Sequence, residues 1–296
     1  MNRFRSGFVG ILGRPNVGKS TLLNRLCGEK LAITSSKPQT TRNRILGVVH
    51  RPDSQIVFLD TPGMHETDRA INRYMQQVIS KVASDVDIVV YMADATRAHG
   101  REDALTLSML PTDTRVPVLL AVNKSDLAGI GKAAERVAFL KGIYNFKEAF
   151  TVSAVTGAGT EELLESISLL LPEGVPYFPE DMVTDQPLGF RLAEMVREKL
   201  FDLTQEEIPY STAVVVEDIT VREDGLMEVG ATVFVEKESQ KGIVIGKKGN
   251  MLQKVGTAAR QEMEARLGKK VYLNLWVKVK KGWTDREGLL RQMGYE

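Results

Sequence analysis

The amino-acid sequence predicts two domains: an α/β domain built on a mostly parallel sheet, and a smaller α+β domain after it. Three observations lead to this prediction. Residues 13–20 form a phosphate-binding loop between a predicted strand and a predicted helix. Four prolines lie within residues 172–187 and interrupt regular structure. Residues 188–296 then return to helix and strand patterns around a short glycine-lysine turn.

The phosphate-binding loop reads GRPNVGKS and is complete as a G-x-x-x-x-G-K-S motif. An apolar run at residues 8–12 precedes it, and a helical pattern at residues 20–27 follows it. This is the strand–loop–helix setting in which backbone N–H groups form a nest for anionic oxygens, helped by the helix N-terminus. The residues expected to hold the nucleotide phosphates are Gly13, Asn16, Val17, Gly18, Lys19, Ser20 and Thr21.

A metal site is expected beside this loop. The Ser20 hydroxyl can ligate Mg²⁺, and the Asp60 carboxylate follows an apolar strand pattern, directly or through water. Thr41 lies in the polar segment 34–44 and is expected to supply a third oxygen, whereas Thr40 reads equally well as an ordinary loop residue. The backbone N–H of Gly63 is expected to reach the γ-phosphate, and the segment 34–44 to become ordered when that phosphate is bound.

The choice of base is predicted by a second motif, NKSD at residues 123–126, after the buried strand pattern of residues 117–122. The Asp126 carboxylate can accept hydrogen bonds from guanine N1–H and its 2-amino group, and adenine would leave it unpaired. Asn123 is expected to tie the base loop to the phosphate loop, and the Lys124 stem to lie along the purine. After a further predicted strand at 149–152, the remaining base-site residues are Ser153 and Ala154, whose backbone N–H is expected at guanine O6.

With these motifs in place, the chain resembles the translation-factor-related GTPases and, within them, the Era family. The resemblance implies GTP or GDP with Mg²⁺ as ligands and GTP hydrolysis as the activity. The residues expected to act in hydrolysis are then Asn16, Lys19, Thr41, Asp60 and Gly63. The segments that carry the resemblance are GRPNVGKSTLLN (13–24), SKPQTTR (36–42), DTPGMH (60–65), NKSD (123–126) and SA (153–154).

Met64 follows Gly63 where many signalling GTPases carry a glutamine that orients the attacking water. A thioether cannot orient that water, so intrinsic turnover is expected to be slow. Relatives with an asparagine at the place of Asn16 use it to help bind K⁺ near the phosphates, and K⁺ is a candidate here as well. The alternative is that Asn16 only stabilises the loop through a hydrogen bond.

Composition bounds the class of protein. The chain has 296 residues, a net charge of +1 and one cysteine, Cys27, for which we expect a buried, unreactive thiol. No apolar run is long enough for a membrane span, and the N-terminus carries no signal-peptide core, which favours a cytoplasmic protein. Residues 237–281 contain twelve basic and three acidic residues, a net charge of +9, so the remainder carries −8. This asymmetry favours a polyanionic partner.

We expect domains at 1–171 and 188–296, joined by a proline-rich linker at 172–187. The second domain is predicted to run helix, strand, strand, helix, turn, helix, strand, with an Asp-Gly hairpin between its first two strands. Its turn, Gly246-Lys247-Lys248-Gly249, resembles the RNA-gripping loop of a type II KH domain. The residues expected to contact RNA are Ile243, Ile245, Gly246, Lys247, Lys248, Gly249 and Asn250.

The combined resemblance to the Era family implies a bacterial factor that binds the 3′ end of the 16S rRNA during assembly of the 30S subunit. It also implies peripheral association with the inner membrane; we expect a monomer that does not bind DNA. A protein partner for the basic domain is one alternative, and a single-strand binder with a vestigial nucleotide site is another.

Arg69 and Arg73 are candidates for transmitting the nucleotide state to the second domain. Trp276 is expected in the core because it lies in the middle of a predicted strand, and no environment is predicted for Trp283.

Overall fold

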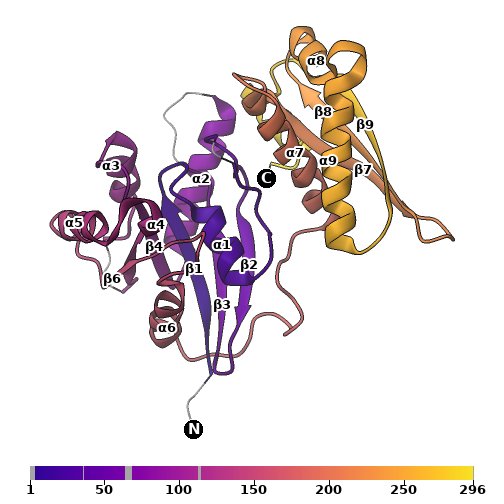
Figure 1. The fold of residues 1–296 in the computed structure, drawn as a ribbon. Helices are drawn as coiled ribbons and strands as arrows, with labels where there is room; N and C mark the ends of the chain where they lie inside the picture. The colour runs from indigo at the N-terminus through magenta and orange to yellow at the C-terminus, as the bar shows by residue number, and fades with distance from the viewer. Residues whose placement is uncertain (1–3, 36, 64–68, 113–114, 296) are drawn as a thin grey trace. The chain divides into compact units, whose positions relative to one another are not determined.

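The computed structural model describes residues 4–35, 37–63, 69–112 and 115–295, which form two compact units (Figure 1). The first unit comprises the described parts of residues 1–32, 41–67 and 72–185. The second comprises the described parts of residues 33–40, 68–71 and 186–296. The segment 33–40 therefore belongs with the C-terminal part of the chain, although it lies between two elements of the first unit in sequence.

A six-stranded sheet with the order β2-β3-β1-β4-β5-β6 forms the centre of the first unit. Its strands are β1 (Arg5–Gly13), β2 (Ile45–His50), β3 (Ser54–Asp60), β4 (Ile88–Asp94), β5 (Val118–Asn123) and β6 (Glu148–Thr151). All neighbours pair in parallel except β2, which runs antiparallel to β3. The predicted mostly parallel sheet with one antiparallel strand at 45–50 is confirmed.

Helices cover both faces of this sheet because its strands alternate apolar side chains toward two separate cores. On β4, for example, Val89 and Tyr91 belong to one core, whereas Val90 and Met92 belong to the other. The first core is closed by α2 (Ala70–Asp85), α3 (Arg101–Ser108) and α5 (Ile130–Lys141). The second core is closed by α1 (Lys19–Cys27) and α6 (Thr160–Leu170).

The parallel register brings the carboxyl ends of the strands to one edge of the sheet. Strands β1, β3, β4 and β5 end at Gly13, Asp60, Asp94 and Asn123, respectively. Within the register, Ile11 pairs with Asp60, Gly13 with Met92, and Asp94 with Asn123. In open α/β sheets this edge is where ligands bind, so the fold alone brings the phosphate-binding loop and the NKSD motif together.

The second unit is a three-stranded sheet with helices packed on it. Strands β7 (Ala213–Val221) and β8 (Met227–Val235) are antiparallel, and β8 pairs in parallel with β9 (Val271–Val279). Apolar residues of α7 (Leu188–Leu203), α8 (Glu238–Ile245) and α9 (Asn250–Leu267) form a single core with this sheet. The order agrees with the predicted type II arrangement, and the predicted hairpin and both sheet strands at 213–235 are confirmed.

The proline-rich segment 172–187 contains no helix and only one isolated bridge, between Glu173 and Arg5. Part of it packs on the first unit: the Tyr177 and Phe8 rings lie 5.0 Å apart, and the backbone amides of Tyr177 and Phe178 donate to Gln55 Oε1. Proline prevents a regular ladder here, so side-chain contacts and single hydrogen bonds hold the segment instead.

The structure reverses the expected environment of one tryptophan and defines that of the other. Trp276 is 46% exposed on β9, so the prediction that it belongs to the core is wrong. On that strand the residues Leu273, Leu275 and Val277 face the core, and Trp276 points the other way by the two-residue alternation. Trp283 is fully buried, and its indole N–H donates to Ser211 O at 3.1 Å.

Candidate functional site

The phosphate-binding loop joins the end of β1 to the start of α1. Gly18 has φ 106°, and a Cβ there would lie 2.3 Å from Asn123 Nδ2, so glycine is needed for both conformation and space. Lys19 is buried, and its ammonium donates to the carbonyl oxygens of Gly13 at 2.8 Å and Arg14 at 3.0 Å. Burial lowers the pKa of Lys19 to about 8, against the opposing effect of the Asp60 charge. The ammonium is thus directed into the loop where phosphate oxygens would be held.

Three side-chain oxygens converge beside Lys19 from three different segments. Ser20 Oγ donates to Asp60 Oδ2 at 2.6 Å and lies 2.7 Å from Thr41 Oγ1, which itself donates to Asp60 Oδ2 at 3.4 Å. Burial raises the pKa of Asp60 to about 6, opposed by the Lys19 charge and by the Ser20 and Thr41 hydroxyls. Its Oδ1 is buried and has no hydrogen-bond partner among the described residues.

These oxygens fit a magnesium ion. Mg²⁺ takes oxygen ligands from one or two carboxylates and hydroxyls together with phosphate and water. A fully buried carboxylate with an unpartnered oxygen is unfavourable unless a cation or proton compensates it. The Thr40 hydroxyl donates instead to Lys37 O at 3.2 Å, so Thr41 rather than Thr40 points to this cluster.

The loop after β3 approaches the phosphate-binding loop closely. A Cβ on Gly63 would lie 2.7 Å from Pro15 Cα, so only glycine lets the two backbones come this near. Thr61 anchors the same loop by donating from Oγ1 to Ile11 O at 2.8 Å. Met64, the residue that follows Gly63, lies outside the described residues.

The NKSD motif is bonded directly to the phosphate-binding loop. Asn123 Nδ2 donates to Val17 O at 2.8 Å, which confirms the expected tie between the two loops. Lys124 Nζ donates to Asn16 O at 2.8 Å. Asp126 lies in α4 (Ser125–Ala128) with its side chain exposed, so any desolvation of this carboxylate has to come from the ligand itself.

The backbone N–H of Ala154, which is expected at guanine O6, has a hydrogen-bond partner in the structure. It donates to Asn123 Oδ1 at 2.9 Å, so a guanine O6 at this position would have to share or replace that bond. The neighbouring Ser153 Oγ accepts from the Thr156 amide at 3.1 Å and stabilises the turn. Arg25 of α1 donates to Ala154 O at 3.4 Å and braces the loop from the other side, a role that sequence reasoning missed.

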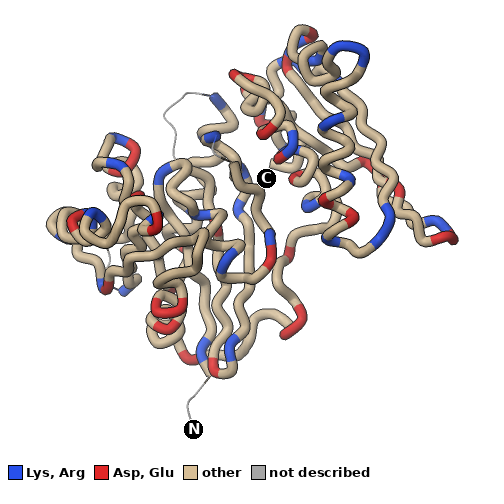
Figure 2. The backbone as a smooth tube through the Cα atoms, viewed as in Figure 1, with Lys and Arg blue, Asp and Glu red and all other residues tan. Residues whose placement is uncertain are grey.

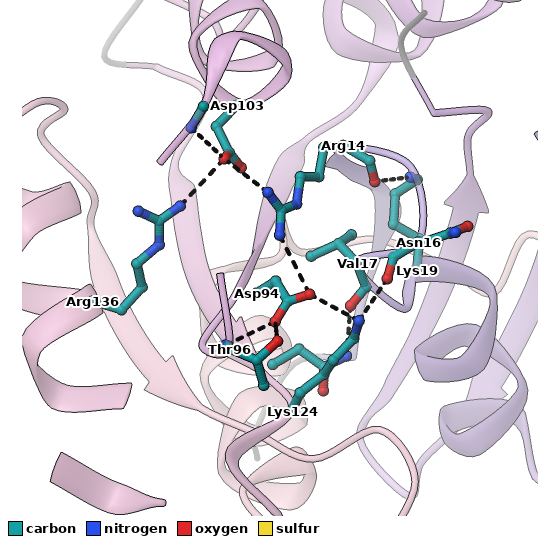
Figure 3. Close-up of polar contacts among 11 residues, drawn as sticks. Arg14, Asn16, Val17, Lys19, Asp94, Thr96, Asp103, Lys124 and Arg136 are labelled. Atoms are coloured by element: carbon teal, nitrogen blue, oxygen red, sulfur yellow. Dashed lines mark hydrogen bonds and ion pairs between the residues drawn. The ribbon is translucent and has the colours of Figure 1, made fainter. Parts of the chain in front are cut away.

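A buried charge network behind the loop was also missed (Figure 3). Arg14 lies 3.3 Å from Asp94 and 3.3 Å from Asp103, and Arg136 lies 3.4 Å from Asp103. Lys124 Nζ lies 2.8 Å from Asp94 Oδ2. The signal that could have revealed this network is an aspartate at the end of the apolar run Ile88–Ala93, the same position that Asp60 occupies on β3.

Within the second unit, two side chains of α7 and one side chain of the segment 33–40 join the segment to the helix and its C-terminal end. Glu198 Oε1 accepts from the Thr34 amide at 3.1 Å. Lys37 Nζ donates to the carbonyl oxygens of Phe201 and Thr204 near the helix C-terminus, and Arg197 donates to Thr40 O. Arg197 is 1% exposed and paired with Glu194, so this attachment is built into the helix core. No local sequence pattern predicts contacts across more than 150 residues.

The glycine-lysine turn lies between α8 and α9 as predicted. Gly246 has φ 74°, and a Cβ there would lie 2.7 Å from the Met251 Cβ, so glycine is required. Lys247 and Lys248 are exposed, and Figure 2 shows basic residues at this turn. Ile243 is half exposed on α8, where it offers apolar surface next to the lysines. The remaining predicted RNA contacts are Ile245, Gly249 and Asn250, all at least partly exposed.

Among the described residues, no helix is both long and apolar enough to cross a bilayer.

A family model described as 50S ribosome-binding GTPase matches residues 8–124, and a KH domain model matches residues 207–284. The chain is 50% identical to GTPase Era of Geobacter metallireducens over 295 residues, 99% of each chain. It is 46% identical to GTPase Era of Caldanaerobacter subterraneus subsp. tengcongensis over 293 residues, 99% of this chain and 98% of the relative.

Two solved structures are similar over nearly the whole chain. One is an Aquifex aeolicus Era variant bound to GDP and AlF₄⁻, at 39% identity and a TM-score of 0.95. The other is Era in complex with MgGDPNP and nucleotides 1506–1542 of 16S ribosomal RNA, at 40% identity and a TM-score of 0.94. Each comparison covers 99% of both chains. With its phosphate-binding loop, its NKSD motif and its KH unit, the chain belongs to the Era family of GTPases.

Proposed function

We propose that this GTPase binds GTP and GDP with Mg²⁺, hydrolyses GTP, and binds the 3′ end of the 16S rRNA during assembly of the 30S subunit. The observation that carries the nucleotide part is the convergence of Ser20, Thr41 and Asp60 beside the buried Lys19 ammonium. The relatives that bind MgGDPNP, GDP with AlF₄⁻ and 16S rRNA nucleotides support the same ligands for this chain.

In this proposal Lys19 and the Gly63 backbone N–H bind the outer phosphates. Ser20, Thr41 and Asp60 hold Mg²⁺, which when bound neutralises charge on the phosphate oxygens. Gly13, Val17, Gly18 and Thr21 complete the phosphate cradle. With Met64 after Gly63, water is positioned without a glutamine, and we expect slow intrinsic turnover.

Base selection is tested by calorimetric titration of GDP, ADP and xanthosine diphosphate. The Asp126 carboxylate accepts two hydrogen bonds from guanine, so GDP should bind at least about 100-fold more tightly than ADP. Asp126→Asn replaces one acceptor by a donor and matches the 2-oxo group of xanthine, so it should transfer the preference to xanthosine diphosphate. Equal affinity of the unmodified protein for GDP and ADP would exclude the proposed function. Lys19→Ala should abolish binding of all three nucleotides.

Potassium is the candidate activator. Asn16 lies in the loop with φ 58°, and its carbonyl oxygen accepts from Lys124. If its amide oxygen helps to hold K⁺ near the phosphates, turnover should be faster in KCl than in NaCl, and Asn16→Ala should remove the difference. Equal turnover in the two salts would leave Asn16 with only the alternative role of stabilising the loop.

RNA binding is tested with an oligonucleotide that matches the 3′ end of the small-subunit rRNA. Affinity should fall steeply with KCl, by a log–log slope of about −0.7 for each neutralised phosphate. Lys247→Asp with Lys248→Asp should abolish binding. A matched control with the same charge change, Lys269→Asp with Lys270→Asp, lies beyond the other end of α9 and should affect binding less. A flat salt dependence would favour the alternative, a protein partner.

The remaining expectations concern the cell and the assembly. We propose a cytoplasmic, monomeric protein. The family resemblance is the basis for proposing peripheral association at the inner membrane. Fractionation before and after a high-salt wash tests the membrane part, because a peripheral protein held by charge should be released by salt. Light scattering of the purified chain tests the monomer.

A further inference from the structure

We propose that Asp94 is a positioning residue for nucleotide binding: it holds Lys124 of the NKSD motif, and with it the purine side of the site, against the phosphate-binding loop. The inference rests on the proposed guanine-nucleotide function and adds a residue to it. Asp94 is 1% exposed and lies at the end of β4, outside every motif described above.

The sheet register places Asp94 beside the NKSD motif. Asp94 pairs with Asn123 across the β4–β5 ladder, and the next amide, that of Ala95, donates to Asn123 O at 2.9 Å. Lys124 therefore leaves β5 alongside the Asp94 side chain. This proximity follows from the parallel pairing of two central strands, so it does not depend on a loop conformation.

Three hydrogen-bond donors and one guanidinium group surround the Asp94 carboxylate (Figure 3). Oδ1 accepts from the Thr96 amide at 2.8 Å and from Thr96 Oγ1 at 2.6 Å. Oδ2 accepts from Lys124 Nζ at 2.8 Å and lies 3.3 Å from Arg14 Nη2. Burial alone would raise the pKa of Asp94, but the hydrogen bonds from Lys124 and Thr96 outweigh it and lower the pKa below its usual value. The carboxylate is therefore ionised at neutral pH and available to bind the Lys124 ammonium.

The lysine that Asp94 holds has an unfavourable backbone conformation. Lys124 has φ 66°, and Asn16, whose carbonyl oxygen accepts the other Lys124 hydrogen bond, has φ 58°. Non-glycine residues adopt this left-handed region only when the surroundings impose it, and such positions gather at functional sites. Asp94 and Asn16 together fix the Lys124 ammonium, so the methylene stem between ammonium and backbone is held in one place before the nucleotide arrives. A stem fixed in advance loses less entropy when a purine packs on it.

The same carboxylate also reaches Arg14 of the phosphate-binding loop. Arg14 is shared with Asp103, whose carboxylate in addition accepts from the Gly100 amide at 3.1 Å and pairs with Arg136. Asp103 is buried like Asp94 and touches the same arginine, but it has no contact with Lys124 among the described residues. This difference supplies a matched control for a purely structural role of a buried aspartate.

The experiment measures the Kd for GDP of Asp94→Asn, of Asp103→Asn and of the unmodified protein under the same conditions. Losing the charge-assisted bond to Lys124 should raise the Kd for GDP by about 10- to 100-fold in Asp94→Asn. The Kd for inosine diphosphate should rise by the same factor, because the Lys124 stem packs on the ring that both purines share. The GDP-to-inosine diphosphate ratio, which Asp126 sets through the 2-amino group, should stay unchanged. Asp103→Asn should raise the Kd less than threefold.

A double-substitution cycle separates a positioning role from a structural one. In a Lys124→Met background, Asp94→Asn should have no further effect on the Kd for GDP. A persisting loss in that background, or equal losses in Asp94→Asn and Asp103→Asn, would overturn the proposal. If Asp94→Asn does not fold, Thr96→Val removes one bond that orients the same carboxylate, and an unchanged Kd for GDP there would also overturn it. Absence of GDP binding by the unmodified protein would instead contradict the proposed function.

Discussion

Lys19 and Asp60 are buried residues of opposite charge, and burial is the largest cause of the shift in the pKa of each. The pKa of Lys19 falls from 10.5 to about 8, so between these values the unfolded chain holds the additional proton. Its contribution to the free energy of unfolding therefore rises with pH in that window. The pKa of Asp60 rises from 3.8 to about 6, so its contribution falls as pH increases through that range. At neutral pH both charges destabilise the fold, and a triphosphate with Mg²⁺ would relieve both.

The pKa of Lys19 predicts how nucleotide affinity depends on pH. Below about pH 8 the ammonium is already formed, whereas above it the lysine must take up a proton before it can bind phosphate. The Kd for GDP should be flat from about pH 7 to about pH 8 and then rise toward a limit of about tenfold per pH unit. Titration of a fluorescent GDP analogue across this range measures the effect. A Kd that stays constant to about pH 9 would contradict the lowered pKa.

Cys27 supplies a second prediction at the scale of one residue. Burial, together with the neighbouring Glu29 charge, raises the pKa of the thiol to about 12, although the side chain is only half buried. The thiolate is the reactive form, so at about pH 8 the folded protein should react with iodoacetamide at least about 100-fold more slowly than in denaturant. Mass spectrometry of quenched samples gives both rates. Equal rates would show that the thiol ionises normally in the fold.

The two tryptophans of the second unit predict opposite responses to truncation. Trp283 is fully buried, donates to Ser211 O, and stacks on Tyr295 with ring centroids 5.8 Å apart. Trp283→Ala should lower the free energy of unfolding by about 3–5 kcal/mol. Trp276→Ala, the matched change at a 46% exposed site, should lower it by about 1 kcal/mol or less. Urea unfolding followed by circular dichroism compares them, and similar losses would contradict the assigned environments.

Most elements of this fold were predictable because their patterns are local. Strand β9 shows alternating apolar residues in the sequence. The turn from Gly246 to Gly249 has a glycine at each end, and both glycines adopt a positive φ, which the residue type favours. The error at Trp276 was avoidable: apolar residues at 271, 273, 275, 277 and 279 assign one face to the core, so position 276 must lie on the other. Being mid-strand does not by itself mean being buried when helices cover only one face of a sheet.

The missed parts of the site have a different origin. Asp94 is one acidic residue after an apolar run, and its role depends on which strand lies next to β4, which local periodicity does not reveal. Likewise the Ala154 amide and Asn123 meet across 31 residues, so the competition for that amide appears only in three dimensions. Most residues expected to bind phosphate belong to the contiguous motif at 13–20, whereas Asp94 and Asp103, which contact Arg14 of this motif, lie far from it in the sequence.

At the scale of the whole molecule, the boundary between the two units runs through the segment that carries Thr41, the threonine expected to ligate Mg²⁺. Thr40 belongs to the second unit and is held by Arg197 of α7, whereas the next residue, Thr41, belongs to the first and lies at Ser20 and Asp60. If loss of the γ-phosphate changes the position of Thr41, the change would act on its neighbour Thr40, which is bonded to Arg197 of α7. Any such coupling must be reciprocal: if GTP strengthens RNA binding by some factor, RNA strengthens GTP binding by the same factor.

This arrangement predicts which residues carry the nucleotide signal to the RNA site. Lys37→Met removes the ammonium from the carbonyl oxygens of Phe201 and Thr204 without disturbing the buried Arg197. The ratio of RNA Kd values measured with GDP and with a non-hydrolysable GTP analogue should fall toward one, losing at least about half of the coupling free energy. The affinity for GDP alone should not change, because the hydrogen bonds of the Lys37 ammonium to described residues go to Phe201 O and Thr204 O, outside the nucleotide site.

The competing route runs through α2, where Arg69 precedes the helix and Arg73 lies in its first turn, both exposed. Arg69→Ala with Arg73→Ala serves as the comparison, measured with the same oligonucleotide and nucleotides. If the segment 33–40 is the route, this double substitution should leave the ratio of RNA Kd values unchanged while Lys37→Met reduces it. If instead Arg69→Ala with Arg73→Ala reduces the ratio of RNA Kd values and Lys37→Met leaves it unchanged, the nucleotide signal would be assigned to α2.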